Sequence, residues 1–346
     1  MSHTGQGQDR WIEPWGEPGW LPGLIAWAER QLAKHGLELA GKITQPHVRP
    51  WSTVLRLPTD RGEVFLKAGA PSQVHEARLM SWMVARWPDS LPPLLAVEKV
   101  QGWLLMGDCG PVLRPQLKED RDLSHWERIL SQYAQLQIDS VESSEALLAL
   151  GVPDRRPSRL EAGLAKIVNV EANLPAEVPR IADETLAELG RRQDDLRHHL
   201  ADLQAAPIPP ALNHGDFHDA NIAYDGQRYK FFDWGDASVS QPFFSLRTVF
   251  VSVENSLGLN WTDPACLRLR DAYLEPWSKL APPAELRRIV GLAAKCWALG
   301  SMLGWHRALK RLAPAERIEY QAIPSLAQEL VDSLAGRDWA GLDVPA

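Results

Sequence analysis

The segment from residue 214 to residue 236 holds polar side chains that suit transfer of a phosphoryl group. It contains HGDFHDAN at residues 214–221 and FFDWGD at residues 231–236. Phosphoryl transfer from Mg-ATP needs a carboxylate that accepts or orients the proton of the accepting hydroxyl, and oxygen ligands that hold Mg²⁺ across the phosphates. Asp216 offers the first group, and Asn221 and Asp233 offer the second.

The spacing of these residues supports that reading. Four residues separate Asp216 from Asn221, as in the catalytic loop of kinases. The dipeptide Asp225-Gly226, a strong hairpin signal, stands between Asn221 and Asp233. A hairpin returns Asp233, with its following x-Gly, to the metal that Asn221 faces. We therefore predict that Asp216 is the catalytic carboxylate and that Asn221 and Asp233 are the metal ligands.

The two motifs resemble those of the aminoglycoside phosphotransferase and choline kinase superfamily, which are small-molecule relatives of protein kinases. The resemblance extends from about residue 52 to residue 242. It implies an α+β, two-lobed, protein-kinase-like fold, in which a small antiparallel β N-lobe with one helix precedes a large, mainly helical C-lobe. ATP is then expected between the lobes, as the co-substrate together with Mg²⁺.

The resemblance also assigns residues that contact the nucleotide. FLKAG places Lys67 on a strand before the helix that carries Glu76, and this pair would lie under the α- and β-phosphates. WLLMGDCG is similar to the strand-to-hinge segment of the family. It implies adenine contacts from the backbone of Gly107 and Cys109, beside Met106.

The chain departs from the family pattern where the phosphate-covering loop is expected. The segment QPHVRPWST at residues 45–53 contains no glycine. Contacts to phosphate there would come from Ser52, from Thr53 or from their backbone N–H groups.

A second departure concerns the pair below the phosphates. Lys67 and Glu76 are only nine residues apart, which requires a short connection into the helix, and Pro71 can provide it by opening the helix at once. If that helix is displaced, Glu63 or Glu98 is the alternative partner.

Hydrophobic patterns predict the elements that position these residues. The N-terminal half should contain a helix over residues 22–35, strands at VLRL and EVFLKA, a helix from residue 71 to residue 87, and strands at LLAVEKV and GWLLM. Beyond residue 117 the patterns are mainly helical, apart from the polar loop and hairpin. We expect a leader and helix at 1–36, a nucleotide-binding N-lobe at 37–108, a hinge near 107–111, and a C-lobe with the catalytic loop and acceptor site at 109–346.

Composition narrows the class of protein. The 346 residues are 45% hydrophobic and 23% charged, as in folded globular proteins. The net charge of −7 argues against nucleic acid or an anionic membrane as the main partner. The three scattered cysteines include no CxxC pair, so we expect neither disulfides nor a thiolate zinc site, and a reducing cytoplasm fits best. The N-terminus lacks a signal-peptide pattern, and no apolar stretch reaches membrane-spanning length.

Several alternatives remain open at this stage. The order His214, Asp216, His218 also suits a metal hydrolase, although that activity would leave Lys67 and Asn221 without a task. The glycine-free covering loop motivates a nucleotide-binding pseudokinase or scaffold.

Two further features have both a structural and a functional interpretation. Asp236 can neutralise a cationic acceptor or cap a helix, and an acidic chain suits an aminated substrate. Trp297, Ser301 and Trp305 recur every four residues, either as core packing or as the wall of an acceptor pocket.

The sequence thus predicts an ATP-dependent phosphotransferase that moves the γ-phosphoryl group to a hydroxyl of a small molecule. An aminoglycoside, an amino sugar, a choline-like compound and another metabolite all remain open as acceptors. GTP is the alternative nucleotide, and the sequence does not fix the oligomeric state.

Overall fold

The computed structural model describes residues 15–337, so most of the expected polar leader lies outside the described residues. Contacts divide the chain into two compact units. The first contains the residues up to 109 together with 308–312, and the second contains residues 110–307 and those from 313 onward.

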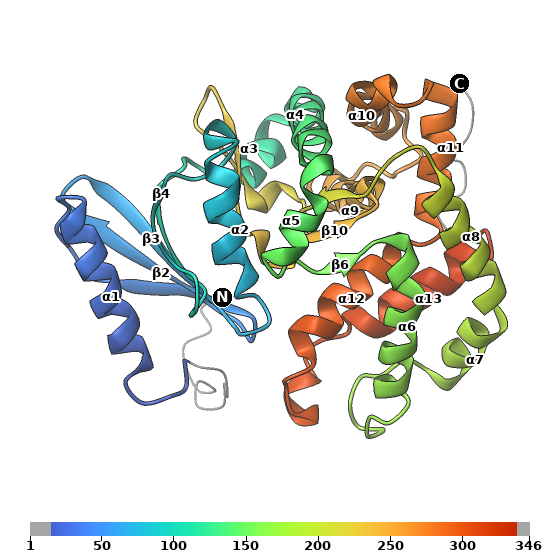
Figure 1. The fold of residues 1–346 in the computed structure, drawn as a ribbon, viewed down its shortest axis with the longest axis horizontal. Coiled ribbons are helices and arrows are strands. Elements are labelled where there is room, and N and C mark those ends of the chain that lie inside the picture. Colours follow the sequence, from blue (N-terminus) through green and yellow to red (C-terminus); the bar gives the residue numbers. More distant parts are fainter. Residues whose placement is uncertain (1–14, 338–346) are drawn as a thin grey trace. The chain divides into compact units, whose positions relative to one another are not determined.

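The first unit is built on an antiparallel five-stranded sheet with the strand order β1-β2-β3-β5-β4. Its strands are β1 (Thr44–Val48), β2 (Ser52–Thr59), β3 (Gly62–Gly69), β4 (Leu94–Glu98) and β5 (Trp103–Gly107). Its helices are α1 (Trp20–Lys34) and α2 (His75–Val84). The two helices lie on opposite faces of the sheet (Figure 1).

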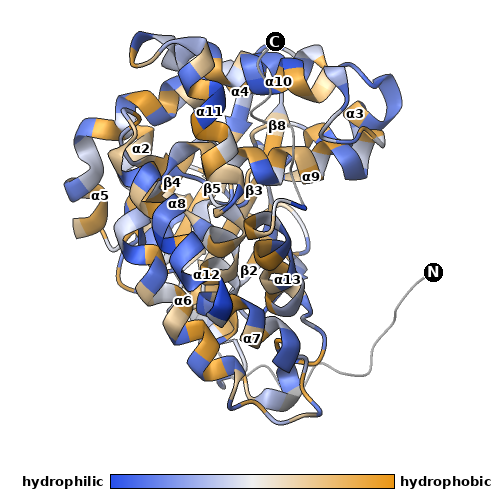
Figure 2. Ribbon diagram, turned by 90° about the vertical axis from the view of Figure 1, so that its right-hand side faces the viewer, coloured by the Kyte–Doolittle hydropathy of each residue, from blue (hydrophilic) through white to orange (hydrophobic). Residues whose placement is uncertain are grey.

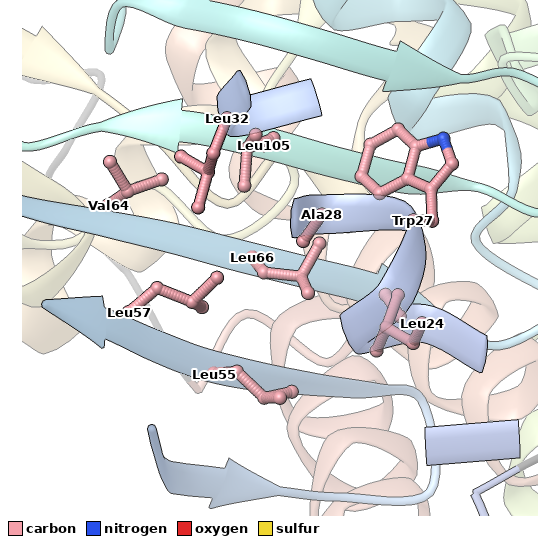
Figure 3. Close-up of a cluster of buried hydrophobic side chains, with 10 residues drawn as sticks. Leu24, Trp27, Ala28, Leu32, Leu55, Leu57, Val64, Leu66 and Leu105 are labelled. Atoms are coloured by element: carbon pink, nitrogen blue, oxygen red, sulfur yellow. The ribbon is translucent and has the colours of Figure 1, made fainter. Parts of the chain in front are cut away.

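The face of the sheet under α1 forms a hydrophobic core. Figure 3 shows side chains of α1 above leucines of the central strands. The buried members of this core are Leu24, Trp27, Ala28, Leu32, Leu55, Leu57, Val64, Leu66, Ala68 and Leu105. Helical spacing puts the α1 members on one stripe, and the two-residue period of strands puts the β2 and β3 members on one face.

The same alternation points Lys67 to the other face. Leu66 and Ala68 face α1, so Lys67, which lies between them on β3, is directed toward α2. Val54 and Leu104 stand opposite Lys67 on the two neighbouring strands. The core of the first unit therefore fixes the direction of the lysine that the sequence singled out.

The second unit is mainly helical. Its helices are α3 (Leu113–Asp120), α4 (Ser124–Ser140), α5 (Ser144–Ala149), α6 (Pro157–Glu171), α7 (Asp183–Arg191), α8 (Gln193–Ala205), α9 (Ser245–Leu257), α10 (Pro264–Leu274), α11 (Pro283–Ala294), α12 (Trp297–Leu309, whose last residues cluster with the first unit) and α13 (Ala322–Leu334). Figure 2 shows hydrophobic and hydrophilic colours side by side on α6, α8 and α12, as expected of helices with one buried face.

Two small sheets interrupt these helices. One has the order β6-β10-β7, from β6 (Asp154–Arg155), β10 (Ser238–Ser240) and β7 (Ala211–Asn213). The other is an antiparallel ribbon of β8 (Ile222–Tyr224) and β9 (Tyr229–Phe231). The predicted hairpin is confirmed: Gly226 takes a φ of 94°, and the Asp225 carboxylate accepts the N–H groups of Gln227 and Arg228.

The α+β class is confirmed, while some boundaries differ from the prediction. The helix expected from Pro71 begins at His75, because residues 71–74 form turns in which Gln73 N–H donates to the Ala70 carbonyl. In the part of the chain that is predicted to be mainly helical, Arg192 separates α7 from α8, and residues 295–296 separate α11 from α12. The small sheet of β6, β7 and β10 was not predicted, because its strands have only two or three residues.

Within residues 15–337, no helix combines the length and the apolar character that crossing a membrane requires.

The central position of Leu66 in this core leads to a prediction about the free energy of unfolding. Its side chain is fully buried between α1 and the sheet. Leu66→Ala should lower the free energy of unfolding by about 2–5 kcal/mol, because it removes buried methyl groups and leaves a cavity. Val100→Ala, at a position that is 77% exposed in the same unit, is the control and should change it by less than about 0.5 kcal/mol. Chemical denaturation measures both, and equal losses would contradict this account of the core.

Candidate active site

The β8–β9 ribbon brings Asn221 and Asp233 to the same end of one hairpin. Asn221 immediately precedes β8, and Asp233 follows β9 by two residues. Ile222 pairs with Phe231, and the N–H of Phe232 donates to the Asn221 carbonyl at 3.1 Å. The hairpin thus places side by side the backbone of the two residues that the sequence predicts as metal ligands.

The carboxylate of Asp216 is held beside Asn221. The Asn221 Nδ2 group donates to the Asp216 backbone carbonyl at 2.9 Å and to Asp216 Oδ2 at 3.3 Å. Asn221 is buried, whereas the Asp216 side chain is 46% exposed. Since the amide nitrogen faces Asp216, the oxygen Oδ1 of Asn221 is the atom left to bind a cation. An amide oxygen and the carboxylate of Asp233 are ligands that Mg²⁺ prefers, and Mg²⁺ takes its other ligands from phosphates and water.

His214 ties the Asp216 loop to the residue before Asp233. Its ring is fully buried, which lowers its pKa to about 4, so it is neutral at pH 7. Nε2 lies 2.9 Å from the Phe232 carbonyl, and the N–H of Asp216 points at Nδ1 at 3.3 Å. A neutral imidazole that donates from Nε2 and accepts at Nδ1 satisfies both contacts. These two contacts orient the loop that carries Asp216.

Two backbone features show how closely the segments pack. Gly215 has a φ of 84°, and a Cβ there would lie only 2.2 Å from the Asp236 carbonyl oxygen, so this position has no room for a side chain. Asp233 has a φ of 65°, a left-handed conformation that Asp and Asn tolerate better than other residues with a Cβ.

A buried polar network supports the loop from below. The N–H of His214 donates to the Tyr133 hydroxyl at 2.9 Å. That hydroxyl also lies 3.1 Å from Ser245 Oγ and accepts from Gln137 Nε2 at 3.2 Å. Burial raises the pKa of Tyr133, so the phenol stays protonated. Its ring stacks on Phe217, with 3.8 Å between the ring centroids.

A second anchor holds the loop through Asp219, which is fully buried. Its carboxylate accepts from Arg114 Nε at 2.6 Å and from Ser256 Oγ at 2.5 Å, and its N–H donates to Ser252 Oγ at 3.2 Å. Arg114 lies on α3, and both serines lie on α9. Sequence reasoning missed Asp219 and Tyr133, because their partners are remote in the chain.

The structure disfavours the metal-hydrolase interpretation. Both ring nitrogens of His214 are engaged in the contacts described above. Over the described part of the chain, no three His, Cys, Asp or Glu side chains gather as a metal site would require. His218 Nε2 lies 3.2 Å from Asp216 Oδ2. Burial acts to lower the pKa of His218, but the hydrogen bond and charge of Asp216 outweigh it, and the pKa is raised.

In the first unit, Lys67 pairs with Glu76. The Lys67 ammonium lies 2.7 Å from the Glu76 carboxylate, and the side chains are only 5% and 4% exposed. The alternative partners have other contacts: Glu63 pairs with Arg56 at 2.8 Å, and Glu98 accepts from the N–H of Val100. The turns of residues 71–74, rather than a helix opened by Pro71, make the short connection between the pair.

The expected covering loop is a tight connection between β1 and β2. Ser52 and Thr53 begin β2 and are buried. The Thr53 hydroxyl donates to the His47 carbonyl at 2.8 Å, and Ser52 Oγ lies 3.4 Å from His47 Nε2. These contacts turn both hydroxyls into the hairpin, so their role toward phosphate stays a prediction.

Met106 and Gly107 are the last two residues of β5. Cys109 ends the first stretch of the first unit, whose second stretch begins at residue 308. The N–H of Gly107 donates to the Pro93 carbonyl at 2.8 Å. An adenine contact through Gly107 would therefore use its carbonyl oxygen.

The network at Tyr133 generates a prediction. Tyr133→Phe removes the acceptor of the buried His214 N–H, so the free energy of unfolding should fall by about 1–3 kcal/mol. Tyr224→Phe is the control, because its hydroxyl makes only an exposed contact with the Gly226 carbonyl. Denaturant unfolding compares the two variants. A Tyr133→Phe protein as stable as the Tyr224→Phe protein would show that the network does not support the loop.

The fold and sequence have relatives among known phosphotransferases. No curated protein sequence matches the chain. Solved structures do match its fold. An ethanolamine kinase from Plasmodium vivax is 13% identical, with a TM-score of 0.61, and the match covers 90% of this chain and 88% of that one. A choline/ethanolamine kinase family protein from Mesorhizobium loti is 17% identical, with a TM-score of 0.59 and coverages of 92% and 97%.

A complex of the phosphotransferase APH(2″) with GDP and kanamycin is 14% identical, with a TM-score of 0.54 and coverages of 91% and 100%. The family model described as the phosphotransferase enzyme family matches residues 30–288, which is most of the chain and includes both motifs. The chain therefore has a kinase-like fold and belongs to the phosphotransferase enzyme family.

Proposed function

We propose that this protein transfers the γ-phosphoryl group of Mg-ATP to a hydroxyl of a small molecule, with Asp216 as the catalytic carboxylate. The observation that carries the proposal is the arrangement at the end of the β8–β9 ribbon. There Asn221 donates to Asp216 and, through the backbone of Phe232, is tied to the segment that bears Asp233.

In the proposed reaction the acceptor oxygen forms a bond to the γ-phosphorus while the bond from that phosphorus to the β–γ bridging oxygen breaks. ADP leaves, and the hydroxyl proton passes to the Asp216 carboxylate and then to solvent. The partly exposed carboxylate is suited to this, because a substrate hydroxyl can reach it while Asn221 fixes its direction. Mg²⁺ held by Asn221 and Asp233 would neutralise the charge that develops on the phosphates.

Lys67 is proposed to bind the α- and β-phosphates of the nucleotide. Glu76 holds the ammonium in one position, and the low exposure of the pair strengthens its interaction with an incoming phosphate. Residues 37–108 would then form the nucleotide-binding lobe, with the adenine near Met106, Gly107 and Cys109, and with Ser52 and Thr53 near the phosphates. Residues 109–346 would supply the catalytic loop and the acceptor site.

ATP is the proposed nucleotide, with GTP as the alternative, since one relative of the same fold is a complex with GDP. The names of the relatives include kinases of ethanolamine and of choline, and kanamycin occurs in one complex. All three are hydroxyl-bearing small molecules. Together they define the first pool of acceptors to test.

The test separates turnover from nucleotide binding. Asp216→Asn should lower acceptor-dependent ADP release by about 10²–10⁴-fold, because the amide cannot accept the hydroxyl proton. The rise in melting temperature on adding Mg-ATP should remain, since Asp216 is not a proposed ligand of the metal.

The matched control is Asp225→Asn, the same change in the hairpin turn, where the amide oxygen can still accept the two backbone N–H groups. It should keep full turnover. Equal turnover by Asp216→Asn would contradict the assignment. Mg-ATP binding by the wild type without ADP release for any acceptor would favour a nucleotide-binding pseudokinase.

A further inference from the structure

A small pocket in the second unit lies directly behind the proposed catalytic loop. Its wall includes Gly215, the residue before Asp216, together with Asn213. Serines of β10 and α12 add hydroxyl groups, and a single charged side chain, that of Arg155, joins them. None of the described residues that line the pocket is Asp or Glu. Aromatic rings line much of the rest of the wall, so the pocket is partly polar and partly apolar and carries one positive charge.

Arg155 is buried, and it forms no ion pair with any residue that the structure describes. It is 6% exposed and lies on β6, opposite Ser240 of β10. Its one hydrogen bond is a long contact of 3.5 Å from Nη1 to the Asp236 carbonyl oxygen, and no carboxylate within residues 15–337 comes within 4.0 Å of its guanidinium. A guanidinium carries five N–H donors, so most of its capacity is unused. Burying a charge in this way is costly unless another group compensates it.

The neighbours of Arg155 add to the positive charge. Burial lowers the pKa of Arg155 to about 10; the charge of Asp236 opposes that effect, and the charge of Arg307 on α12 adds to it. Burial also lowers the pKa of Arg307, and the charge of the same Asp236 opposes that shift. Arg155 therefore keeps its charge at pH 7, and the Asp236 carboxylate interacts with both arginines.

The helix α12 leaves room for the guanidinium. A Cβ at Gly304 would lie 3.5 Å from both Nη atoms of Arg155, so the flat group lies against the bare backbone of the helix. Ser301 and Trp297 of the same helix also line the pocket, which places two of the three residues of the predicted helix stripe at its wall.

We infer that this pocket recognises a carboxylate of the acceptor, bound by the guanidinium of Arg155 beside the proposed catalytic loop. The inference rests on the proposed function for calling the ligand an acceptor, and it narrows that acceptor to hydroxy acids, including hydroxy amino acids. The planar fork of arginine matches the two oxygens of a carboxylate.

The size of the pocket favours a small end group. Its cavity volume is only about 20 Å³. A single water needs roughly 10–15 Å³ by that measure. A pocket of that size has no room for a sugar ring, so only a small end group of the acceptor would enter it, and the rest would extend toward Gly215 and Asp216.

The local charge differs from what the whole chain suggests. The net charge of −7 suits an aminated substrate, and Asp236 was a candidate to bind its cation. In the structure the Asp236 carboxylate interacts instead with the positive charges of Arg155 and Arg307. An acceptor bound here by its carboxylate gains the ion pair that Arg155 lacks within the described chain.

The first experiment measures substrate preference with matched pairs that differ only in charge. The probes are glycerate, L-serine and L-homoserine, each beside its carboxamide, and the readout is kcat/KM for ADP release. Wild type should prefer at least one acid over its amide by about tenfold or more, as a charge-assisted bidentate pair supports. Arg155→Met should abolish that preference, and Arg155→Lys, which keeps the charge without the fork, should keep part of it.

Arg159→Met is the matched control, because Arg159 is 65% exposed on α6, four residues further along the chain. It should leave the acid preference unchanged. The inference is overturned if no acid is preferred by the wild type, or if the preference survives in Arg155→Met.

A second experiment removes any dependence on turnover. Melting temperatures are measured with each acid and each amide, without nucleotide. The acid should stabilise the wild type and Arg159→Met but not Arg155→Met. In the absence of probes, Arg155→Met should melt at the same temperature as the wild type or higher, because it removes an uncompensated buried charge. If Arg155→Met instead melts at a markedly lower temperature, and every variant that folds, Arg155→Lys included, still binds the acid, Arg155 only stabilises the fold.

These experiments separate the two proposals. If acids bind through Arg155 but Mg-ATP is never turned over, the pocket assignment stands and the proposed function fails. If ADP release proceeds on neutral or cationic acceptors alone, the proposed function stands and the pocket assignment fails.

Discussion

A buried imidazole joins the two segments that carry the proposed chemistry. His214 contacts the N–H of Asp216 on one side and the carbonyl of Phe232, the residue before Asp233, on the other. Complete burial keeps the ring neutral, so it can accept on one nitrogen and donate from the other. The spacing between the proposed catalytic carboxylate and the proposed metal ligands therefore depends on one uncharged ring. Tyr133 and Asp219 fix the same loop to the helices of the second unit.

The chain places its buried charges in two different ways. Lys67 and Glu76 compensate each other at 2.7 Å, which holds a cation ready in the first unit without leaving it unpaired. Arg155 is buried beside the proposed catalytic loop with no carboxylate of the described residues within ion-pair distance. Burial makes an uncompensated charge unfavourable for folding and favourable for binding an anion. The paired arrangement suits Lys67, which must be held in one position, and the unpaired arrangement suits Arg155 as a binding group for an anion.

The sequence predicted the features that depend on short-range patterns. The hairpin at Asp225-Gly226, the α+β class and the pairing of Lys67 with Glu76 follow from turn chemistry, periodicity and a family motif, and the structure contains all three. It could not supply contacts between distant positions. Tyr133 meets His214 from 81 positions away, and Arg114 meets Asp219 from 105. Nor did it show that Arg155 is buried, since the strand that carries this residue is only two residues long. The start of α2 at His75 depends on local turns that the proline signal did not reveal.

The central claim is that Asn221 and Asp233 hold a metal–nucleotide complex, and thermal unfolding with and without Mg-ATP tests it most directly. Asp233→Asn is the informative variant, because asparagine tolerates the left-handed backbone at this position and removes only the charge. Mg-ATP at about 100 times its Kd should stabilise the wild type by about 2.7 kcal/mol, an effect that needs Mg²⁺ and is largely lost in Asp233→Asn. An equal stabilisation of both proteins, or none in the wild type with either ATP or GTP, would contradict the account.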